Sequence, residues 1–166
     1  MSSLSGRNLH LRKSCLKRFL LFGGLSLGVF WLDQETKRAI LNLPQRTLEV
    51  TPFFNIVHVW NKGVGFGFLS QIGAMPLFVM IVGCALVFFF WRTFKESSYL
   101  NVGLYGLIVG GALGNLRDRF IHGAVFDFLD FYWGTAHFPA FNAADTSITL
   151  GGTLLVLFYQ KEDNYP

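Results

Sequence analysis

The sequence predicts an all-α membrane protein of one domain, with four transmembrane helices and short strands resting on the outer membrane surface. Three observations predict this fold class. Only 14% of the 166 residues are charged, whereas about 25% are charged in an average soluble domain. Hydrophobic residues make up 52% of the chain, and 18 Gly and 19 Phe contribute to its apolar character. The mean hydropathy of +0.42 excludes a disordered chain and favours lipid over a soluble core as the surroundings of these side chains.

The four transmembrane helices are predicted from uncharged apolar stretches whose lengths bracket the ~20 residues that cross a hydrocarbon layer. Together with flanking residues that reach the headgroups, they cover about 16–32, 72–91, 99–116 and 138–159. The first stretch is the shortest, but Lys17 and Arg18 can snorkel back to the headgroups and lengthen it. We interpret it as a retained helix, because the residues after Leu32 offer no small-residue cleavage site for a signal peptide.

Charge predicts that both termini lie in the cytoplasm. Five of the fourteen Lys and Arg residues lie between Arg7 and Arg18, and positive residues beside the first helix usually decide orientation. Residues 1–18 are therefore interpreted as a basic cytoplasmic lead, and no nucleic-acid partner is expected from this charge. The two cysteines, Cys15 and Cys84, have no CxxC spacing and indicate no metal site. The sequence does not indicate the oligomeric state.

Residues 33–71 and 117–137 are predicted to lie outside the membrane. Residues 47–68 mix β-branched and aromatic side chains before a glycine-rich turn, which favours short strands on the outer surface. Residues 117–131 form a polar and aromatic segment that carries three aspartates. The third span presents four glycines at helical spacing, and these favour close packing of a neighbouring helix over a groove for lipid. They are Gly103, Gly106, Gly110 and Gly114.

Asp145 is the acidic residue that most needs an explanation. It lies in a long stretch with no other formal charge, and an ionised Asp at the centre of a membrane helix costs ~2.5–3.5 kcal/mol. Counted from Pro139, Asp145 lies about 9 Å along the helix. Asn142 and Thr149 share its helical face and can hydrogen-bond the carboxylate. We therefore favour a functional role over a bond to a neighbouring helix.

Asp127 is the second candidate, because Val125, Phe126 and Phe128 surround it at the outer membrane edge. Loss of solvation among such side chains raises the pKa of a carboxyl group, as a catalytic acid requires. The turn between Asp127 and Asp145 can bring the two carboxylates together. One carboxylate of such a pair takes a proton from water while the other protonates an amide oxygen. This chemistry needs no metal, cofactor or covalent nucleophile.

Other chemistries have weaker support. A serine triad needs a His beside Ser147, but His137 lies at the membrane edge. No HExxH or paired His spacing supports a metal site built from other acidic residues and a His. The residues of that site would be Asp118, Asp127, Asp130 and His122.

Two alternatives from other functional classes stay open. The first is a small proton-coupled carrier, because carboxylates inside membranes also serve as proton relays. Against it, the acidic residues crowd the outer edge, and no charge continues inward beyond Asp145. The second is a noncatalytic assembly factor whose polar cluster fixes helix packing.

Several polar residues near the outer surface are expected to support the two aspartates. Asp33 and Lys37 lie one helical turn apart just beyond the first span, which is typical of a local ion pair. Asn115, Asp118 and Arg119 cluster at the outer end of the third helix, where Asp118 and Arg119 are expected to pin the segment that follows. Arg119 has an alternative role, the binding of an anionic lipid headgroup.

Five sequence blocks occur in a fixed order along the chain. They are Asp33-Gln34-Glu35-Thr36-Lys37, Asn61-Lys62-Gly63, Gly110-Gly111-Ala112-Leu113-Gly114-Asn115-Leu116-Arg117-Asp118-Arg119, Gly123-Ala124-Val125-Phe126-Asp127-Phe128 and Phe141-Asn142-Ala143-Ala144-Asp145. In this order and spacing the blocks resemble the signature of lipoprotein signal peptidase, also called signal peptidase II. The resemblance runs from about Asp33 to Gly151.

The resemblance implies an aspartic endopeptidase of the bacterial inner membrane, with four transmembrane helices, a small periplasmic β-cradle and a short periplasmic helix. It implies an active site at the periplasmic face of the membrane, in contact with phospholipid. The implied substrates are prolipoproteins whose cysteine already carries diacylglycerol, and cleavage occurs just before that cysteine. Globomycin-type inhibitors, which place a hydroxyl between the two aspartates, are implied ligands.

By position, Asp127 and Asp145 match the catalytic pair of the family. Nine further residues match its supporting or substrate-binding positions: Asn61, Gly63, Asn115, Asp118, Arg119, Asn142, Ala144, Asp33 and Lys37. One departure is Gly65, because the family usually has Ala or Ser there, and Gly leaves room beside the substrate. The acyl chains of the substrate are expected between helices, along either the glycine face or the Phe-rich second span.

Overall fold

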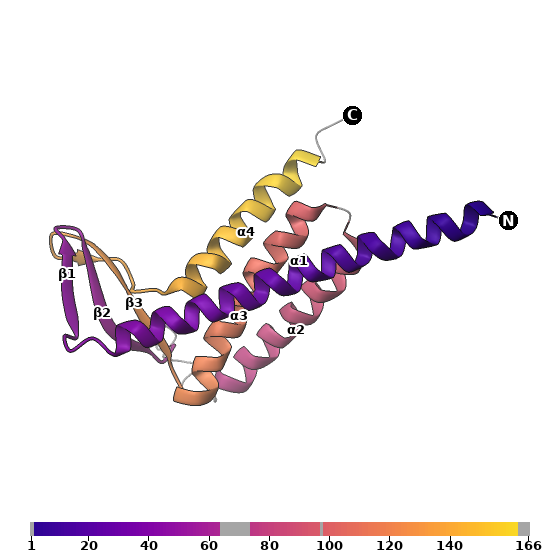
Figure 1. Cartoon of the computed structure of the whole chain (residues 1–166). Helices are drawn as coiled ribbons and strands as arrows, with labels where there is room; N and C mark the ends of the chain where they lie inside the picture. Colours follow the sequence, from indigo (N-terminus) through magenta and orange to yellow (C-terminus); the bar gives the residue numbers. More distant parts are fainter. Residues whose placement is uncertain (1, 64–73, 97, 163–166) are drawn as a thin grey trace.

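The computed structural model describes residues 2–63, 74–96 and 98–162, which form a helical bundle with a small sheet at one end (Figure 1). The helices are α1 (Ser2–Leu41), α2 (Ala74–Lys95), α3 (Tyr99–His122) and α4 (Ala143–Glu162). The strands are β1 (Thr47–Thr51), β2 (Phe54–Asn61), β3 (Val125–Trp133) and β4 (Ala136–His137). All neighbouring strands are antiparallel, in the order β1-β2-β3-β4. The start of α1 and the end of α4 lie away from the sheet.

Two of the described helices are long and apolar enough to cross a membrane. These are the part of α1 from Ser14 to Leu41 and the whole of α3, Tyr99–His122. In α4, residues Ala143–Phe158 form a shorter apolar helix. The structure therefore supports a mostly helical protein with membrane-spanning segments and a small antiparallel sheet.

The helix ends differ from the ends of the predicted spans. Helix α1 continues beyond residue 32 to Leu41, and α3 continues beyond residue 116 to His122. Gly123 ends α3, because its φ of 68° turns the chain away while its N–H donates to the carbonyl of Arg119. Helix α4 begins at Ala143, although the sequence predicts its span from residue 138. Residues 138–141 instead extend along β3, where the N–H of Phe138 donates to the carbonyl of Phe131.

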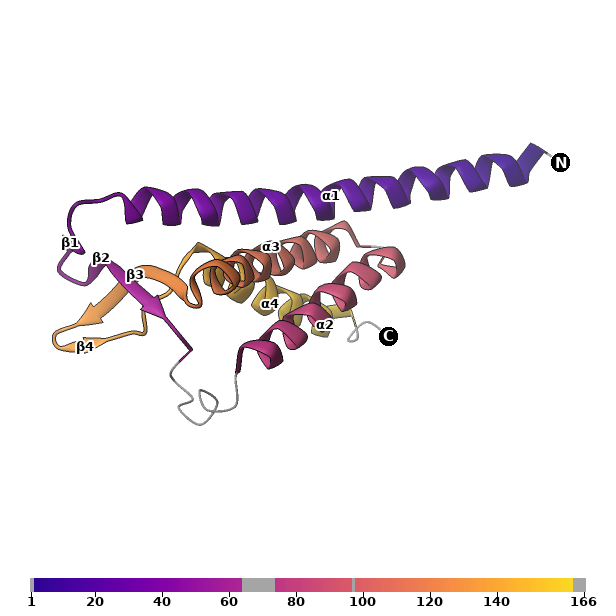
Figure 2. The same ribbon diagram turned by 90° about the horizontal axis from the view of Figure 1, so that it is seen from below.

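The glycine face of α3 packs against α1, as the sequence predicts. A methyl group added to Gly110 would lie 2.6 Å from the carbonyl oxygen of Ser26, and one added to Gly106 would lie 3.0 Å from that of Phe22. Figure 2 shows α1 running alongside α3. Because α1 covers this face, the face offers no room for the acyl chains of a substrate, and that part of the expectation is wrong.

The sheet confirms the prediction of short strands in residues 47–68 for the described part of that segment, which ends at residue 63. Strand β2 pairs with β3 so that Trp60 lies opposite Phe126 and Asn61 lies opposite Val125. Strand β3 falls in residues 117–137, where no strand was predicted from the residues themselves. Residues 42–63 contain no helix, so the short periplasmic helix implied by the resemblance does not lie there. Residues 64–73 lie outside the described residues, and Gly65 is one of them.

Candidate active site

Asp127 lies in β3 with its side chain almost fully buried. Its Oδ1 accepts a hydrogen bond of 2.7 Å from Nδ2 of Asn142, and its Oδ2 accepts one of 3.0 Å from Nδ2 of Asn61. Asn61 is itself held by the N–H of Gly63, which donates to its Oδ1 at 2.9 Å. Gly63 has a φ of 72°, a conformation that favours glycine. The Asn-x-Gly element thus points an amide group at the carboxylate.

Asp145 lies in the first turn of α4. Its Oδ1 accepts a hydrogen bond of 2.7 Å from Nδ2 of Asn115, and its Oδ2 accepts one of 3.2 Å from the backbone N–H of Asn142. Asn142 caps the helix, because its Oδ1 accepts from the N–H of Asp145 at 2.9 Å. Because α4 begins at Ala143, Asp145 lies in its first turn and not about 9 Å along a helix that starts at Pro139. Asn142 lies just before the helix and not on a helical face shared with Thr149.

Asn142 is the residue that connects the two carboxylates. Its side-chain amide donates to Asp127 and its backbone N–H donates to Asp145, while the side chain is fully buried. The chain reaches this position because Leu129 and Phe141 form an antiparallel bridge, with N–H to O distances of 2.8 and 3.1 Å. The predicted turn does fold Asp145 back toward Asp127.

Lys37 holds the base of the site together. Its Nζ lies 2.8 Å from Oδ2 of Asp33 and 2.8 Å from Oδ2 of Asp118, and all three side chains are buried. The same Nζ donates to Oδ1 of Asn115 at 3.2 Å. Asp33 also accepts a hydrogen bond of 3.0 Å from the backbone N–H of Ala144. The predicted local ion pair is confirmed, and it additionally joins α1 to α3 and α4.

Asp118 and Arg119 occupy different parts of the site. Oδ2 of Asp118 accepts a hydrogen bond from the backbone N–H of Phe126 at 3.3 Å, which fixes the start of β3 as predicted. Arg119 donates to the carbonyl of Asn115 at 3.3 Å, and its charge interacts with the carboxylates of Asp145 and Asp127. The structure thus brings all eleven candidate residues into one connected cluster.

Gln34 is a member of this network that was not among the site residues predicted from the sequence. Its Nε2 donates to Oδ2 of Asp33 at 3.0 Å and to Oδ1 of Asp118 at 3.3 Å. The partner Asp118 lies on another helix, so the sequence pattern around Gln34 carries no signal for this contact. Its position inside the first of the five sequence blocks is the one hint available.

The environment of Asp127 favours its protonated form. Burial is the main cause, and the nearby charge of Asp145 acts in the same direction, so the pKa of Asp127 rises from 3.8 to about 6. The amides of Asn61 and Asn142 and the charge of Lys37 oppose this rise. Because the folded chain holds this proton more tightly than the unfolded chain, the resulting stabilisation is complete below about pH 4 and is lost as the pH rises through about 6.

A direct titration checks this raised pKa. In wild-type protein, the ¹³C chemical shift of the Asp127 carboxyl group is expected to titrate near pH 6 in detergent micelles. In Asn61→Ala the midpoint is expected to move to higher pH, because the variant loses a hydrogen bond that favours the ionised form. Asn55→Ala is the matched control, since Asn55 donates to Asp130. A wild-type midpoint near 4, or the same midpoint in Asn61→Ala, would contradict this account.

The structure does not bring together the residues considered for a serine triad or for a metal site. Asp130 pairs with Nδ1 of His137 at 2.9 Å, whereas His122 lies against the ring of Trp60. In residues 2–63, 74–96 and 98–162, no three His, Cys, Asp or Glu side chains are grouped as ligands of one metal ion would be. Oγ of Ser147 donates to the carbonyl of Ala144, so it is not bonded to His137.

Comparison with known proteins identifies the family of this chain. The family model for signal peptidase II matches residues 25–160. The chain belongs to the signal peptidase II family. The lipoprotein signal peptidase of Aeromonas hydrophila subsp. hydrophila is 43% identical over 140 residues, which cover 80% of this chain and 84% of the relative. That of Shewanella halifaxensis is 44% identical over 135 residues, which cover 78% and 79% of the two chains.

A solved structure supports the same conclusion at the level of the fold. It is described as a bacterial membrane enzyme, and it matches this chain with a TM-score of 0.73 and 34% sequence identity over 84% of this chain and 87% of the other. Signal peptidase II is a membrane protease, so the chain is an enzyme of lipoprotein processing. This identification replaces the two alternatives considered from the sequence, a proton-coupled carrier and an assembly factor.

Proposed function

We propose that this signal peptidase II is an aspartic endopeptidase whose catalytic residues are Asp127 and Asp145. The observation that supports this assignment is the position of Asn142, which donates one hydrogen bond to each carboxylate. The two acidic groups face one another across a single buried amide, at the end of the bundle where the sheet begins. The substrate is a prolipoprotein whose cysteine carries diacylglycerol, and the bond cut is the one just before that cysteine.

The reaction needs one proton on the pair of carboxyl groups. We place it on Asp127, because burial raises the pKa of that carboxyl group. Asp145 takes a proton from water as the water oxygen attacks the scissile carbonyl carbon, and Asp127 protonates the carbonyl oxygen. The tetrahedral intermediate then collapses: one of its hydroxyl groups returns a proton to Asp127 as the carbonyl re-forms, the C–N bond breaks, and the proton on Asp145 passes to the amine of the lipidated cysteine. Asn115 and Asn142 hold the carboxylates in place, and no metal or cofactor takes part.

The membrane position of the site follows from its substrate. The acyl chains keep the cysteine of the precursor at the lipid boundary, so the scissile bond must lie there as well. All four helices cross the bacterial inner membrane in this proposal, with both termini in the cytoplasm and the site at the periplasmic face. The basic residues before residue 19 support this orientation.

The acyl chains of the substrate bind along α2. Two apolar cavities lie on this helix, with volumes of about 650 and 410 Å³. Val87 lines both of them, Phe88 lines the first, and Phe90 lines the second, which also reaches α1 and α3. This position agrees with the expectation for the Phe-rich second span. Globomycin-type inhibitors are expected to bind between Asp127 and Asp145.

A reconstituted assay tests the proposed substrate and the metal-free mechanism together. Purified protein is incubated with a diacylglyceryl precursor and with the same precursor lacking the lipid. The lipidated precursor is expected to be cut before its cysteine, the other to remain intact, and globomycin to stop the reaction. Mass spectrometry of the products gives the cleavage position.

A chelator arm of the same assay tests the metal alternative. The rate is expected to be unchanged in millimolar EDTA, because both proton transfers use carboxyl groups of the chain. A loss of activity in EDTA that added divalent metal restores would reject this mechanism in favour of a metal site. Equal cleavage of the unlipidated precursor would reject the proposed substrate.

A further inference from the structure

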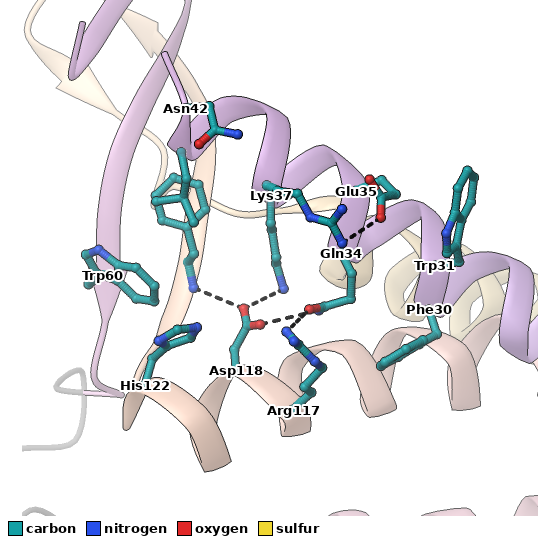
Figure 3. Close-up of a pocket in the computed structure, with 13 residues that line it drawn as sticks. Phe30, Trp31, Gln34, Glu35, Lys37, Asn42, Trp60, Arg117, Asp118 and His122 are labelled. Atoms are coloured by element: carbon teal, nitrogen blue, oxygen red, sulfur yellow. Dashed lines mark hydrogen bonds and ion pairs between the residues drawn. The ribbon is translucent and has the colours of Figure 1, made fainter. Parts of the chain in front are cut away.

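A third cavity, of about 470 Å³, lies between α1, the end of α3 and strand β2 (Figure 3). His122, Asp118 and Arg117 rise from α3 toward α1, and Trp60 of β2 stands beside His122. On the α1 side, Gln34 and Lys37 point into the cavity, with Phe30 and Trp31 beyond them. Lys37 and Asp118 also support the candidate active site, but the proposed reaction gives no role to Arg117, His122, Phe30 or Trp31.

The cavity lies on the opposite side of the sheet from the two candidate catalytic residues. Trp60 and Phe126 lie opposite each other in strands β2 and β3, and both line the cavity. The next residue in each strand, Asn61 and Asp127, points the other way, where the two side chains bond each other. The backbone of the two strands therefore lies between the cavity and Asp127, while Lys37 and Asp118 of the cavity lining also belong to the network beneath the candidate active site.

Among the charged side chains that line the cavity, Arg117 has no acidic partner within the described residues. Both acidic side chains of the lining are paired, Asp118 with Lys37 and Glu35 with Arg38 at 2.9 Å. Arg117 donates to the neutral amide oxygen of Gln34, and it forms no ion pair with any residue in the described part of the chain. His122 adds an imidazole, which offers an N–H donor in either protonation state. The lining is thus suited to an anion.

The surroundings of the cavity match the edge of a membrane. It lies where both candidate spans, in α1 and α3, end at the sheet. Trp31 is 64% exposed and Trp60 is 41% exposed, and Trp side chains are enriched at the boundary between lipid and water. A ligand with a negatively charged head and an apolar tail can place its head on Arg117 and its tail along Phe30 and Trp31.

We propose that this cavity binds the phosphate group of an anionic phospholipid. Arg117 binds two phosphate oxygens through its planar guanidinium group, and His122 donates to a third. Phe30 and Trp31 contact the glycerol and the first carbons of the acyl chains. The proposal does not rest on the proteolytic reaction, because Arg117, His122, Phe30 and Trp31 have no part in it and the test involves no cleavage of a precursor.

Lipid retention measured by native mass spectrometry tests the proposal. The purified protein in detergent is offered equal amounts of phosphatidylglycerol and phosphatidylcholine with the same acyl chains. Wild-type protein is expected to retain phosphatidylglycerol in excess. Arg117→Gln is expected to lower this excess about tenfold or more, the range expected for the loss of a charged hydrogen bond. Arg117→Lys, which keeps the charge without the planar fork, is expected to fall between the two.

Arg46→Gln is the matched control, because Arg46 is an exposed cation near the sheet that does not line the cavity. It is expected to retain lipid as wild type does. Arg117 is also exposed, so both variants are expected to fold, and their thermal unfolding confirms this. Equal retention of the two lipids by wild type, or equal lipid preference in Arg117→Gln and wild type, would overturn the proposal. The proposal would also be overturned if Arg46→Gln lost as much of its preference for phosphatidylglycerol as Arg117→Gln.

Soluble glycerol phosphate distinguishes a lipid from a free phosphate. Added at millimolar concentration, it is expected to leave phosphatidylglycerol bound, because it lacks the acyl chains that contact Phe30 and Trp31. Complete displacement of the lipid by glycerol phosphate would assign the cavity to a water-soluble phosphate and overturn the lipid assignment.

Discussion

Replacement of either Asp127 or Asp145 by Asn is expected to abolish cleavage of a lipidated precursor. The amide cannot exchange protons with water or with the scissile carbonyl, and positioned proton transfer contributes ~10²–10⁴-fold to such reactions. Because the two carboxyl groups act as one unit, we expect each single variant to lose at least about 10³-fold in kcat, and the double variant to lose little more. Single-turnover cleavage of the precursor, at equal amounts of folded protein, measures the effect.

Asp130→Asn is the matched control for this experiment. Asp130 is a buried Asp in the same strand as Asp127, but it bonds His137 and Asn55 outside the candidate active site. Its variant is expected to keep activity within a few fold, even where its stability falls. The metal alternative makes the opposite prediction, because Asp130 is one of the ligands in that site. Full turnover by either Asp127→Asn or Asp145→Asn would remove the two-aspartate mechanism.

Replacement of Lys37 by Met is expected to have the largest effect on stability. Lys37 is the shared partner of Asp33 and Asp118, and all three side chains are buried. Without it, two carboxylates remain close together and unpaired in the interior, and breaking a buried pair costs about 3–5 kcal/mol. We expect the free energy of unfolding to fall by about this amount, and cleavage to fall with the amount of folded protein. Denaturant unfolding in micelles measures the change.

Two further variants test whether the unpaired carboxylates cause the loss of stability, or whether any substitution on α1 does so. Arg38→Gln removes the neighbouring exposed cation, whose pair with Glu35 lies at the surface, and is expected to change stability by no more than about 1 kcal/mol. Lys37→Met combined with Asp118→Asn is expected to recover part of the loss, because it removes one of the unpaired charges. If the double variant is no more stable than Lys37→Met, the unpaired carboxylates are not the cause of the instability.

Much of the candidate site is predictable from the sequence because its parts have local signatures. Asp145 is notable as an isolated charge in an apolar stretch, and Asp127 as a carboxylate among Phe and Val. The Asp33–Lys37 pair follows from helical spacing alone, and the structure contains it. Each of these inferences uses side chains within a few residues of one another, so no knowledge of the rest of the fold is needed.

The roles of Asn142 and Gln34 could not be predicted in the same way. Asn142 caps α4 and bonds Asp127 because the bridge between Leu129 and Phe141 delays the start of the helix to Ala143. Gln34 contacts Asp118, which lies 84 positions along the chain. In both cases the contact depends on a partner from another element, and the pattern of neighbouring residues does not identify that partner.

The sequence by itself determined where the helices form, which surface of α3 packs against a neighbour, and which side chains are able to do acid–base chemistry. These properties depend on apolar length, on residue size at helical spacing and on the chemistry of single residues. Only the tertiary structure decided where α1, α3 and α4 end and that β3 pairs with β2. It also decided that Asp127 faces Asp145 on one side of the sheet, while a cavity lined by Arg117 lies on the other side. Those outcomes depend on buried charges and backbone groups finding partners far away in the chain, because a polar group left unpaired away from water costs more than extending or shortening a helix by a few residues.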